Sequence, residues 1–550
     1  MKKVFLPFCL SLIIGHVLAQ SALTSSDVSI EIRNLLEAHI INGSNHNGKL
    51  NLVQYDLLLK FYTNRDFQEA WTQKGRLSEN AQKLLGQIEE ARFDGLTPEE
   101  YHLSEIKDFI NEFSLKNENE SSLHLAYIDL ILSDAYLKLA TDLYRGKVSQ
   151  EALKTDWEIQ PKRMKLKFEE ELESALKSGK LTENLKGFWP VFKVYPRMRE
   201  SLRAYHKMEQ NDAIDWNKIS GNKVLKVGEY GKVVADVRKR LWFWKDLKEY
   251  TPEEVELYDS AMMEGVLHFQ KRNGLTADGV VGKDTYDALN ETPAALIKKV
   301  AVNLERMRWL PDTVMDNRFV VVNIANFQLD LVQQNGLDTI FSSPVIVGRQ
   351  YHTTPIFNGE MSYIVLSPTW TVPSSIIRNE MIPKIKKDPN YLNRNHLKIL
   401  TYSGQEVNPS AIDWSKTSSK SFPYMIRQSP GPHNSLGLAK FIFPNKHNVY
   451  IHDTPSKSLF SKDIRAFSHG CIRVQNPERL AEVILEDNKD WGHKEIEAAM
   501  HSGRETTVML KEKIPVVLLY LTFWTDESGN PHIRKDIYER DRRISEALFD

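Results

Sequence analysis

The residues best suited to chemistry lie in one segment near the end of the sequence. His469 lies two residues before Cys471, and His452 lies nineteen residues before it. A nucleophilic thiol needs a nearby imidazole to accept its proton, and an ion pair between the two lowers the thiol pKa from about 8.5. The segment therefore predicts a cysteine nucleophile that is a thiolate at neutral pH, with a histidine base.

The chain has two cysteines, Cys9 and Cys471. Cys9 lies in an apolar run at residues 4–14, preceded by two lysines and followed by small or apolar residues at 17–19, which is the pattern of a cleaved secretory signal. Because the run is shorter than about 20 residues, we expect export and removal of residues 1–19 rather than a membrane anchor. Cys471 then has no disulfide partner, and its surroundings must distinguish a reactive thiol from a small buried side chain.

The alternation of side chains along an extended strand predicts which face His452 lies on. Tyr450 and His452 share one face of such a strand, whereas Val449 and Ile451 face the core. We therefore expect His452 to be presented at the surface of a site rather than buried. Gly470 permits a sharp turn, which can leave backbone N–H groups pointing at a developing oxyanion.

The elements that must position these residues fall into three parts, since 550 residues exceed one hydrophobic core. Residues 20–216, including the apolar three-and-four spacing at 126–143, predict a helical scaffold. Residues 222–292 combine glycine turns with helical spacing and predict a small three-helix bundle. Residues 293–550 begin with a helix and continue as β-branched or alternating segments, which predict a mainly-β domain. The predicted fold class is multidomain α+β.

An insertion at residues 373–424 interrupts the strand pattern with a helical stretch at 376–386 and a polar stretch to Ser421. An insertion of this length predicts a mobile lid subdomain beside a site.

The 72 basic and 73 acidic side chains leave no net electrostatic field that would attract a polyanion, and no basic cluster alternates with aromatic residues. Nucleic acid is therefore excluded as an expected partner.

The segment around Cys471 resembles the catalytic signature of L,D-transpeptidases of the YkuD type. Those enzymes carry a histidine, a spacer of about fifteen residues, then Ser/Thr-His-Gly-Cys, an apolar residue and Arg or Asn. Here His452 is followed by fifteen residues and then by Ser468-His469-Gly470-Cys471-Ile472-Arg473. Residues 222–292 resemble the peptidoglycan-binding module found beside many wall enzymes. With the scaffold, the insertion and the segment 427–437, the resemblance extends to the large Gram-negative branch of the family.

The resemblance implies roles for individual residues. Cys471 would be the nucleophile and His452 its base, oriented by the backbone carbonyl of Asp453. His469 and the backbone of Gly470 and Cys471 would shape the oxyanion site. Which histidine is the base, and whether the Asp453 carboxylate takes part, stay open. Supporting or substrate contacts are expected from Ser468, Arg473, Tyr450, Asp453, Trp370, Tyr424, Arg427, Asn434 and Gly437.

The reaction implied by the resemblance is a two-step acyl transfer on peptidoglycan peptide stems in the periplasm. A cysteine thioester forms with loss of a terminal D-alanine. A stem amine then gives a 3-3 crosslink, a protein lysine gives a wall anchor, and water gives a trimmed tripeptide by L,D-carboxypeptidase activity. No cofactor is implied. Carbapenems are the expected inhibitors, and other wall-synthesis proteins are possible partners.

Two alternative interpretations belong to other classes. A zinc-dependent peptidoglycan amidase or peptidase could use a mixed His/Cys ligand set, drawn from His433, His447, His452, His469 and Cys471. A single thiolate lacks the paired spacing of zinc sites, so we expect no metal. A non-catalytic wall-binding protein would instead use the central bundle and retain Cys471 as a passive buried side chain.

Overall fold

The computed structural model describes residues 25–42, 51–73, 76–115, 121–151, 153, 157–159, 166–211, 214–221, 223–248, 256–312, 318–333, 338–417 and 422–549. The expected signal peptide and residues 418–421 of the insertion lie outside these ranges. The chain divides into two compact units: residues up to 90, 98–140 and 166–187 form one, and residues 91–97, 141–165 and 188 onward form the other. Within the described ranges, no helix has both the length and the apolar character needed to cross a membrane.

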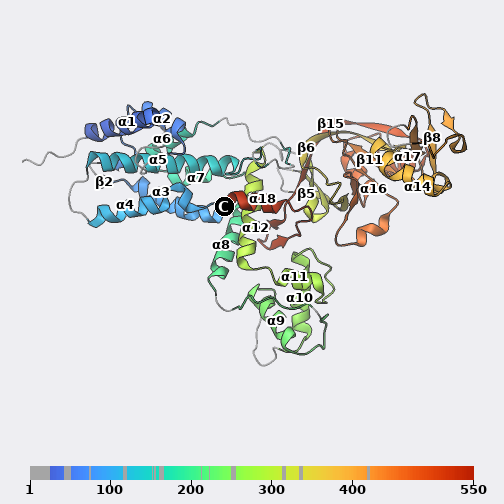
Figure 1. Ribbon diagram of the computed structural model, residues 1–550, viewed down its shortest axis with the longest axis horizontal. Coiled ribbons are helices and arrows are strands. Elements are labelled where there is room, and N and C mark those ends of the chain that lie inside the picture. The colour runs from blue at the N-terminus through green and yellow to red at the C-terminus, as the bar shows by residue number, and fades with distance from the viewer. Residues whose placement is uncertain are drawn as a thin grey trace, which may run out of the picture. The chain divides into compact units, whose positions relative to one another are not determined.

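The first unit is helical, as the sequence predicts for the scaffold (Figure 1). Its longest helix is α5 (Ser122–Arg145). Residues three and four apart share a helix face, and the predicted apolar positions Ile128, Leu132 and Ala135 are each at most 1% exposed. The other helices of this unit are α1 (Ser25–Asn42), α2 (Tyr55–Thr63), α3 (Glu79–Glu90), α4 (Leu103–Leu115), α6 (Phe168–Ser178) and α7 (Leu181–Lys186).

The second unit contains the predicted three-helix bundle, formed by α9 (Lys232–Phe243), α10 (Ser260–Arg272) and α11 (Lys283–Leu289). The side chain of Asp259 caps α10 by accepting from Met262 N at 2.8 Å. The linking helix α12 (Pro293–Trp309) follows, with Thr292 as its N-cap and proline at its first turn, as helix-start preferences require. It packs against α8 (Val194–Glu209) and α18 (Asp541–Phe549).

The mainly-β part of this unit is built on a nine-stranded sheet in the order β13-β5-β14-β12-β11-β6-β15-β3-β4, in which β4 also pairs with β5. Most pairings are antiparallel, but β13 with β5, β12 with β14, and β15 with β3 are parallel. The helix α16 (Pro477–Ile484) follows β14 directly. The strands are β3 (Phe319–Asn323), β4 (Gln328–Gln333), β5 (Asp338–Gly348), β6 (Phe357–Leu366), β11 (Ala439–Ile442), β12 (Ile451–His452), β13 (Ala466–Ser468), β14 (Ile472–Val474) and β15 (Thr506–Leu519).

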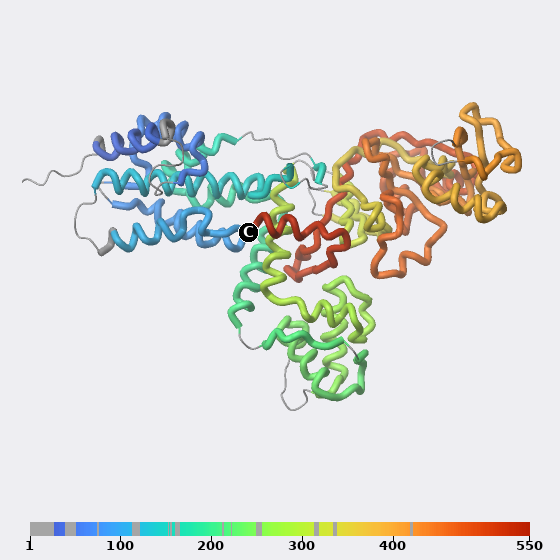
Figure 2. Tube along the Cα trace, in the orientation of Figure 1, coloured from blue at the N-terminus to red at the C-terminus, as the bar shows by residue number. Residues whose placement is uncertain are grey.

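The insertion is a folded subdomain with its own sheet, in the order β7-β10-β8-β9 (Figure 2, light orange). Its helices are α13 (Ser374–Ile376), the π-helical turn η7 (Ile377–Met381), α14 (Ile382–Lys387) and α15 (Tyr391–Arg394). Its strands are β7 (Trp370–Thr371), β8 (Leu397–Leu400), β9 (Glu406–Val407) and β10 (Met425–Gln428).

The polar stretch after residue 386 is therefore not irregular throughout, because it contributes β8 and β9 to this sheet. Apolar side chains on the strands and helices of the subdomain form a core separate from that of the main sheet. Ile399 and Ile426 lie in this core and are 1% and 0% exposed. The sequence patterning missed β8 because the strand has only four residues and the flanking segments are mostly polar.

Because the insertion and the main sheet have separate cores, we expect that shortening a buried side chain in one core destabilises that part alone. Ile426 in the insertion and Ile364 in the main sheet are both 0% exposed, and deleting three buried carbons typically costs about 2–5 kcal/mol. We expect Ile426→Ala to speed amide hydrogen exchange in residues 370–428 and leave the nine-stranded sheet protected. Ile364→Ala is the matched control and should weaken the sheet itself. Equal loss of protection in both regions by Ile426→Ala would contradict separate cores.

Candidate active site

The parallel pairing of two short strands, β12 and β14, brings the predicted catalytic residues together. His452 ends β12 and Cys471 immediately precedes β14, and these strands pair so that His452 lies opposite Arg473. Ile472 N donates to Tyr450 O at 3.1 Å, which holds the cysteine segment against the histidine strand. On the other side of β12, Lys440 of β11 lies opposite His452. The fifteen-residue spacer thus returns the chain to a neighbouring strand of the same sheet.

A cavity of about 610 Å³ opens between these strands and the insertion. Seven of the predicted site residues line it: Trp370, Tyr450, His452, Ser468, His469, Cys471 and Arg473. The insertion contributes Pro373, Ile376, Glu380, Met381, Tyr391 and Leu397 to the same wall. Residues of the insertion thus line the same cavity as Cys471 and His452, and a role as a lid stays a prediction.

The imidazole of His452 is oriented by a main-chain oxygen. Its Nδ1 lies 2.5 Å from the carbonyl oxygen of Asp453, and because a carbonyl can only accept, Nδ1 carries the proton. Nε2 is then left as the basic nitrogen. This matches the orienting carbonyl that the resemblance implied, and it favours His452 over His469 as the base.

His452 is buried, contrary to the prediction that strand alternation would present it. It is 5% exposed. Tyr450 and His452 do share a face, with ring centroids 5.6 Å apart, but the flanking strands and the insertion cover that face. Burial, followed by the positive charge of Arg473, lowers the pKa of His452 from 6.5 to about 3. The imidazole is consequently neutral at physiological pH and able to accept a proton.

The thiol of Cys471 is half-buried, and its Sγ donates to Asn448 O at 3.7 Å. Burial raises the pKa of Cys471, and the nearby charges of Lys440 and Arg473 offset this only in part. The predicted Cys⁻/His⁺ pair is therefore wrong for the resting protein, because desolvation disfavours both charged forms. The two groups rest as a neutral thiol and a neutral imidazole.

The turn before Cys471 is held by hydrogen bonds to Ser468. Ser468 Oγ donates to Cys471 O at 2.5 Å and accepts from Gly470 N at 3.1 Å. Gly470 has φ 110°, which favours glycine, and its carbonyl accepts from Thr354 Oγ1 at 2.9 Å. The Gly470 N–H is thus occupied and does not face an oxyanion as expected. The Cys471 N–H, in contrast, donates to no group in the part of the chain that the structure describes.

His469 lies beside the cysteine but bonds to the insertion. Its Nε2 makes a hydrogen bond and ion pair with Glu380, which stands on the π-helical turn η7. Neither Glu380 nor Lys440 was predicted from the sequence. Lys440 could have been found, because it alternates with the buried Phe441 on a predicted strand. Glu380 carried no signal, since only the fold brings it near His469.

The remaining predicted contacts lie outside the described lining of the cavity. Asp453 is 4% exposed, and its carboxylate accepts from Lys457 Nζ at 2.6 Å and from Leu438 N at 2.9 Å. Gly437 has φ 61°, and a Cβ there would come within 2.2 Å of the Asp453 carboxylate. These two residues therefore support the loop that leads to β11.

Three further candidates brace the base of the insertion. Arg427 Nε donates to Thr371 Oγ1 at 3.1 Å. Asn434 is buried and donates to Pro368 O at 2.9 Å. Tyr424 packs its ring against Phe422 with centroids 5.6 Å apart, in the core of the insertion. Their contacts are with the protein itself, so a direct role toward a substrate stays a prediction.

The residues that the sequence analysis considered as zinc ligands do not form one cluster among the described residues. His433 stacks on His396 with ring centroids 4.2 Å apart, and His447 pairs with Glu158 at 3.0 Å. Among the described residues, the groups of three close potential ligands include neither of these histidines, nor His452 or Cys471.

Comparison with known families agrees with this geometry. Family models match three segments: residues 56–202, described as "Scaffold domain", residues 231–289, described as "Putative peptidoglycan binding domain", and residues 317–502, described as "L,D-transpeptidase catalytic domain". Residues 317–502 are thus similar to the catalytic domain of L,D-transpeptidases. The resemblance stated from the sequence, with its scaffold and peptidoglycan-binding parts, is confirmed.

One curated relative, from Haemophilus influenzae (strain ATCC 51907 / DSM 11121 / KW20 / Rd), is named "Putative L,D-transpeptidase" and is 35% identical over 252 residues. The match covers 46% of this chain and 50% of the relative, so the chain spans about half the length of the curated relative it matches.

Two solved structures also match. One is an L,D-transpeptidase from Xylanimonas cellulosilytica, at 16% identity and TM-score 0.17, covering 55% of this chain and 99% of that one. The other is a fused Zn-dependent amidase/peptidase/peptidoglycan-binding domain-containing protein from Clostridium acetobutylicum, at 12% identity and TM-score 0.16, covering 54% and 99%.

The raised thiol pKa predicts how Cys471 reacts with alkylating agents. In the mature chain, the rate of alkylation by iodoacetamide should rise with pH and reach half its maximum above the ordinary thiol pKa of about 8.5. Lys440→Met should move the midpoint further up, because it removes a charge that stabilises the thiolate. Lys446→Met, an exposed lysine paired with Glu158, is the control and should leave it unchanged. A midpoint at or below pH 7 would show that the ion pair forms after all.

Proposed function

We propose that this chain is an L,D-transpeptidase that forms 3-3 crosslinks, or protein anchors, in peptidoglycan through a thioester on Cys471. The observation that carries the proposal is the convergence of Cys471, the neutral His452 and the cation of Arg473 on one cavity in an L,D-transpeptidase catalytic domain. The proposal places the protein in the periplasm, on the strength of the signal-peptide pattern at residues 1–19.

In the first step, His452 Nε2 takes the thiol proton while Sγ attacks the carbonyl of the third residue of a tetrapeptide stem. The resulting oxyanion accepts from the Cys471 N–H, and its charge is favoured by nearby cations. When the tetrahedral intermediate collapses, His452 returns its proton to the leaving amine of the terminal D-alanine. The third residue then remains on Sγ as a thioester.

In the second step, an amine attacks the thioester carbonyl and gives a proton to His452. The thiolate leaves and takes that proton back, which restores the resting neutral pair. An amine on a second stem gives a 3-3 crosslink, and a lysine of another protein gives an anchor. Water in place of the amine gives a trimmed stem, the L,D-carboxypeptidase side reaction.

Two cations on the sheet support recognition of the acidic stem and stabilise charge during attack. Arg473 lines the cavity, and its buried Nε has no hydrogen-bond partner among the described residues. Lys440 also lines it, with Nζ 4.1 Å from the centroid of the Tyr450 ring. A buried N–H group without a hydrogen-bond partner is costly, and a bound carboxylate or the developing oxyanion could accept from Arg473 Nε and relieve that cost. Burial lowers the pKa of both side chains.

The other parts of the chain suit work on a polymer. The insertion would act as a lid that holds the donor stem, since nine of its residues line the cavity. The peptidoglycan-binding domain at residues 231–289 would hold the chain on its substrate. Other wall-synthesis proteins are the proposed partners, and carbapenems, which carry their own reactive carbonyl, are the proposed inhibitors.

Purified disaccharide tetrapeptides that contain a diamino acid at position three provide the direct test. With the full mature chain, mass analysis should show loss of D-alanine and formation of dimers joined between third residues. Cys471→Ala should give neither. His452→Ala should slow the reaction by at least about 100-fold, the usual effect of removing a general base, while His469→Ala should retain more activity.

The alternatives predict other products. A zinc amidase would separate the peptide from the sugar and would stop when a chelator is added. A wall-binding protein would bind the muropeptides unchanged, and Cys471→Ala would have no effect. Products of either kind, with Cys471→Ala as active as the unaltered chain, would overturn the proposal.

A further inference from the structure

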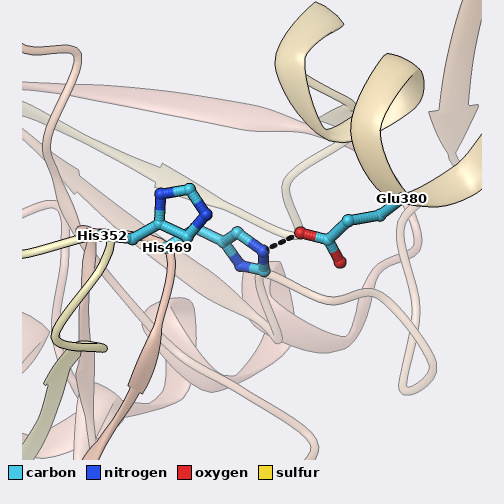
Figure 3. Close-up of side chains that lie close together, drawn as sticks. All are labelled: His352, Glu380 and His469. Atoms are coloured by element: carbon cyan, nitrogen blue, oxygen red, sulfur yellow. Dashed lines mark hydrogen bonds and ion pairs between the residues drawn. The ribbon is translucent and has the colours of Figure 1, made fainter.

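Three side chains from distant parts of the second unit meet at the edge of the cavity: His352, Glu380 and His469 (Figure 3). The imidazole of His469 lies between the other two side chains, with its ring 5.2 Å from that of His352 and its Nε2 hydrogen-bonded to Glu380. One potential ligand atom from each side chain lies within 4.8 Å of those of the other two. All three residues line the cavity that contains Cys471.

This set of donors suits a divalent transition metal. Two imidazole nitrogens and a carboxylate oxygen are a common zinc ligand set, with bonds of about 2.0–2.2 Å. Bonds of that length place tetrahedral ligand atoms roughly 3.3 Å apart. Ligand atoms as far apart as the 4.8 Å limit would have to approach by about 1.5 Å, whereas the hydrogen-bonded atoms of His469 and Glu380 would have to separate slightly. Water or substrate fills the fourth coordination position of a site with three protein ligands. His352 is exposed, so this position would be accessible from solvent.

The two histidines are held in place by the main sheet. β5 and β13 pair in parallel, with Gly348 opposite Ser468, so the chains leaving them run side by side toward His352 and His469. Thr354 Oγ1 bridges the two loops, accepting from Gly348 N and donating to Gly470 O, each at 2.9 Å. A Cβ on Gly348 would lie 2.0 Å from His352 O, which shows how closely the loops pack.

The third ligand comes from the insertion. Glu380 stands on the π-helical turn η7, whose neighbours Ile377 and Met381 are buried in the core of the insertion. π-helical turns are rare and often mark functional sites. Two cationic side chains lie near Glu380, but neither forms a close ion pair with it. Lys384 Nζ is 3.8 Å from the Glu380 carboxylate and half exposed. Arg349 donates instead to Phe467 O at 3.1 Å and to Tyr351 Oη at 2.9 Å.

We propose that His352, Glu380 and His469 bind Zn²⁺, and that the ion fastens the insertion to the catalytic loop and stops acyl transfer. The metal would replace a single hydrogen bond between His469 and Glu380 with three coordinate bonds that cross the mouth of the cavity. Donor stems could then neither enter nor leave. The metal site itself is independent of the chemistry, whereas its inhibitory effect rests on the proposed transpeptidase function. The sequence predicted no metal, because the ligands are scattered from residue 352 to residue 469.

Binding is measured first, without turnover. Full-length mature chain carrying Cys471→Ala is titrated calorimetrically with Zn²⁺, and separately with Co²⁺ to record its absorption spectrum. We expect one equivalent of each metal. His352→Ala and Glu380→Gln should each weaken zinc binding by about 100-fold or more, since even supporting residues of metal sites contribute 10–100-fold.

A second cluster on the same domain provides the matched control. Glu478, Glu482 and His493 also place three potential ligand atoms close together, on α16 and α17 (His493–His501). His493→Ala should leave the affinity unchanged. His352 and His493 are both exposed, so loss of folding is not expected in either variant, and equal melting temperatures without metal check this. Binding that is lost in His493→Ala, or kept in His352→Ala, would overturn the site.

The effect on the reaction is measured second, as the ratio of crosslinking rates without and with saturating Zn²⁺. The unaltered chain should show a ratio of at least about 10, and His352→Ala a ratio near 1. Zinc bound at these residues with a ratio near 1 in the unaltered chain would overturn the inhibitory role. If no crosslinking occurs in any condition, the proposed function fails, and the calorimetric comparison still decides the metal site.

Discussion

The parallel pairing of β12 with β14 is the constraint on which the site depends. It sets His452 opposite Arg473 and places Cys471 at the entrance to β14. A one-residue slip of register would send every side chain to the opposite face, and this is opposed by Ile451 and Ile472, which lie opposite each other and are both fully buried. The reactive groups stand at strand ends and on a loop, but the hydrophobic core of the sheet determines how they face one another. The same logic applies to β5 and β13, which carry the neighbouring loops to the cavity.

Burial gives this site a different electrostatic character from that of an exposed thiolate–imidazolium pair. Desolvation keeps both Cys471 and His452 neutral, and the charges of Lys440 and Arg473 favour the thiolate while opposing the imidazolium. Proton transfer is then coupled to attack on a bound carbonyl rather than completed beforehand. Oxidation of a cysteine follows its thiolate character and exposure. A neutral, half-buried thiol is thus suited to a chain expected to leave the cytoplasm with a single cysteine.

The sequence predicted the fold class and the central residues because their signals are local. Helical spacing, glycine turns and strand alternation each act over a few residues, and the spacing of His452 from Cys471 is a motif. What it missed depends on contacts between distant segments. Burial of His452 follows from flanking strands and the insertion, and the engagement of the Gly470 N–H follows from the Ser468 rotamer. Glu380 reaches the site only because the insertion folds around its own core.

The insertion is linked to both points, since it lines the cavity that holds Cys471 and His452 and supplies Glu380, the hydrogen-bond partner of His469. It has a core of its own, whereas Cys471 immediately precedes a strand of the main sheet. In the proposed reaction, Cys471 carries the acyl group between donor and acceptor. Brief mixing of the mature chain with a tetrapeptide stem, acid quenching and peptide mapping by mass spectrometry would detect this intermediate. We expect the mass of the stem without its terminal D-alanine on the peptide that contains Cys471. Turnover with no such adduct, or an adduct on another residue, would contradict it.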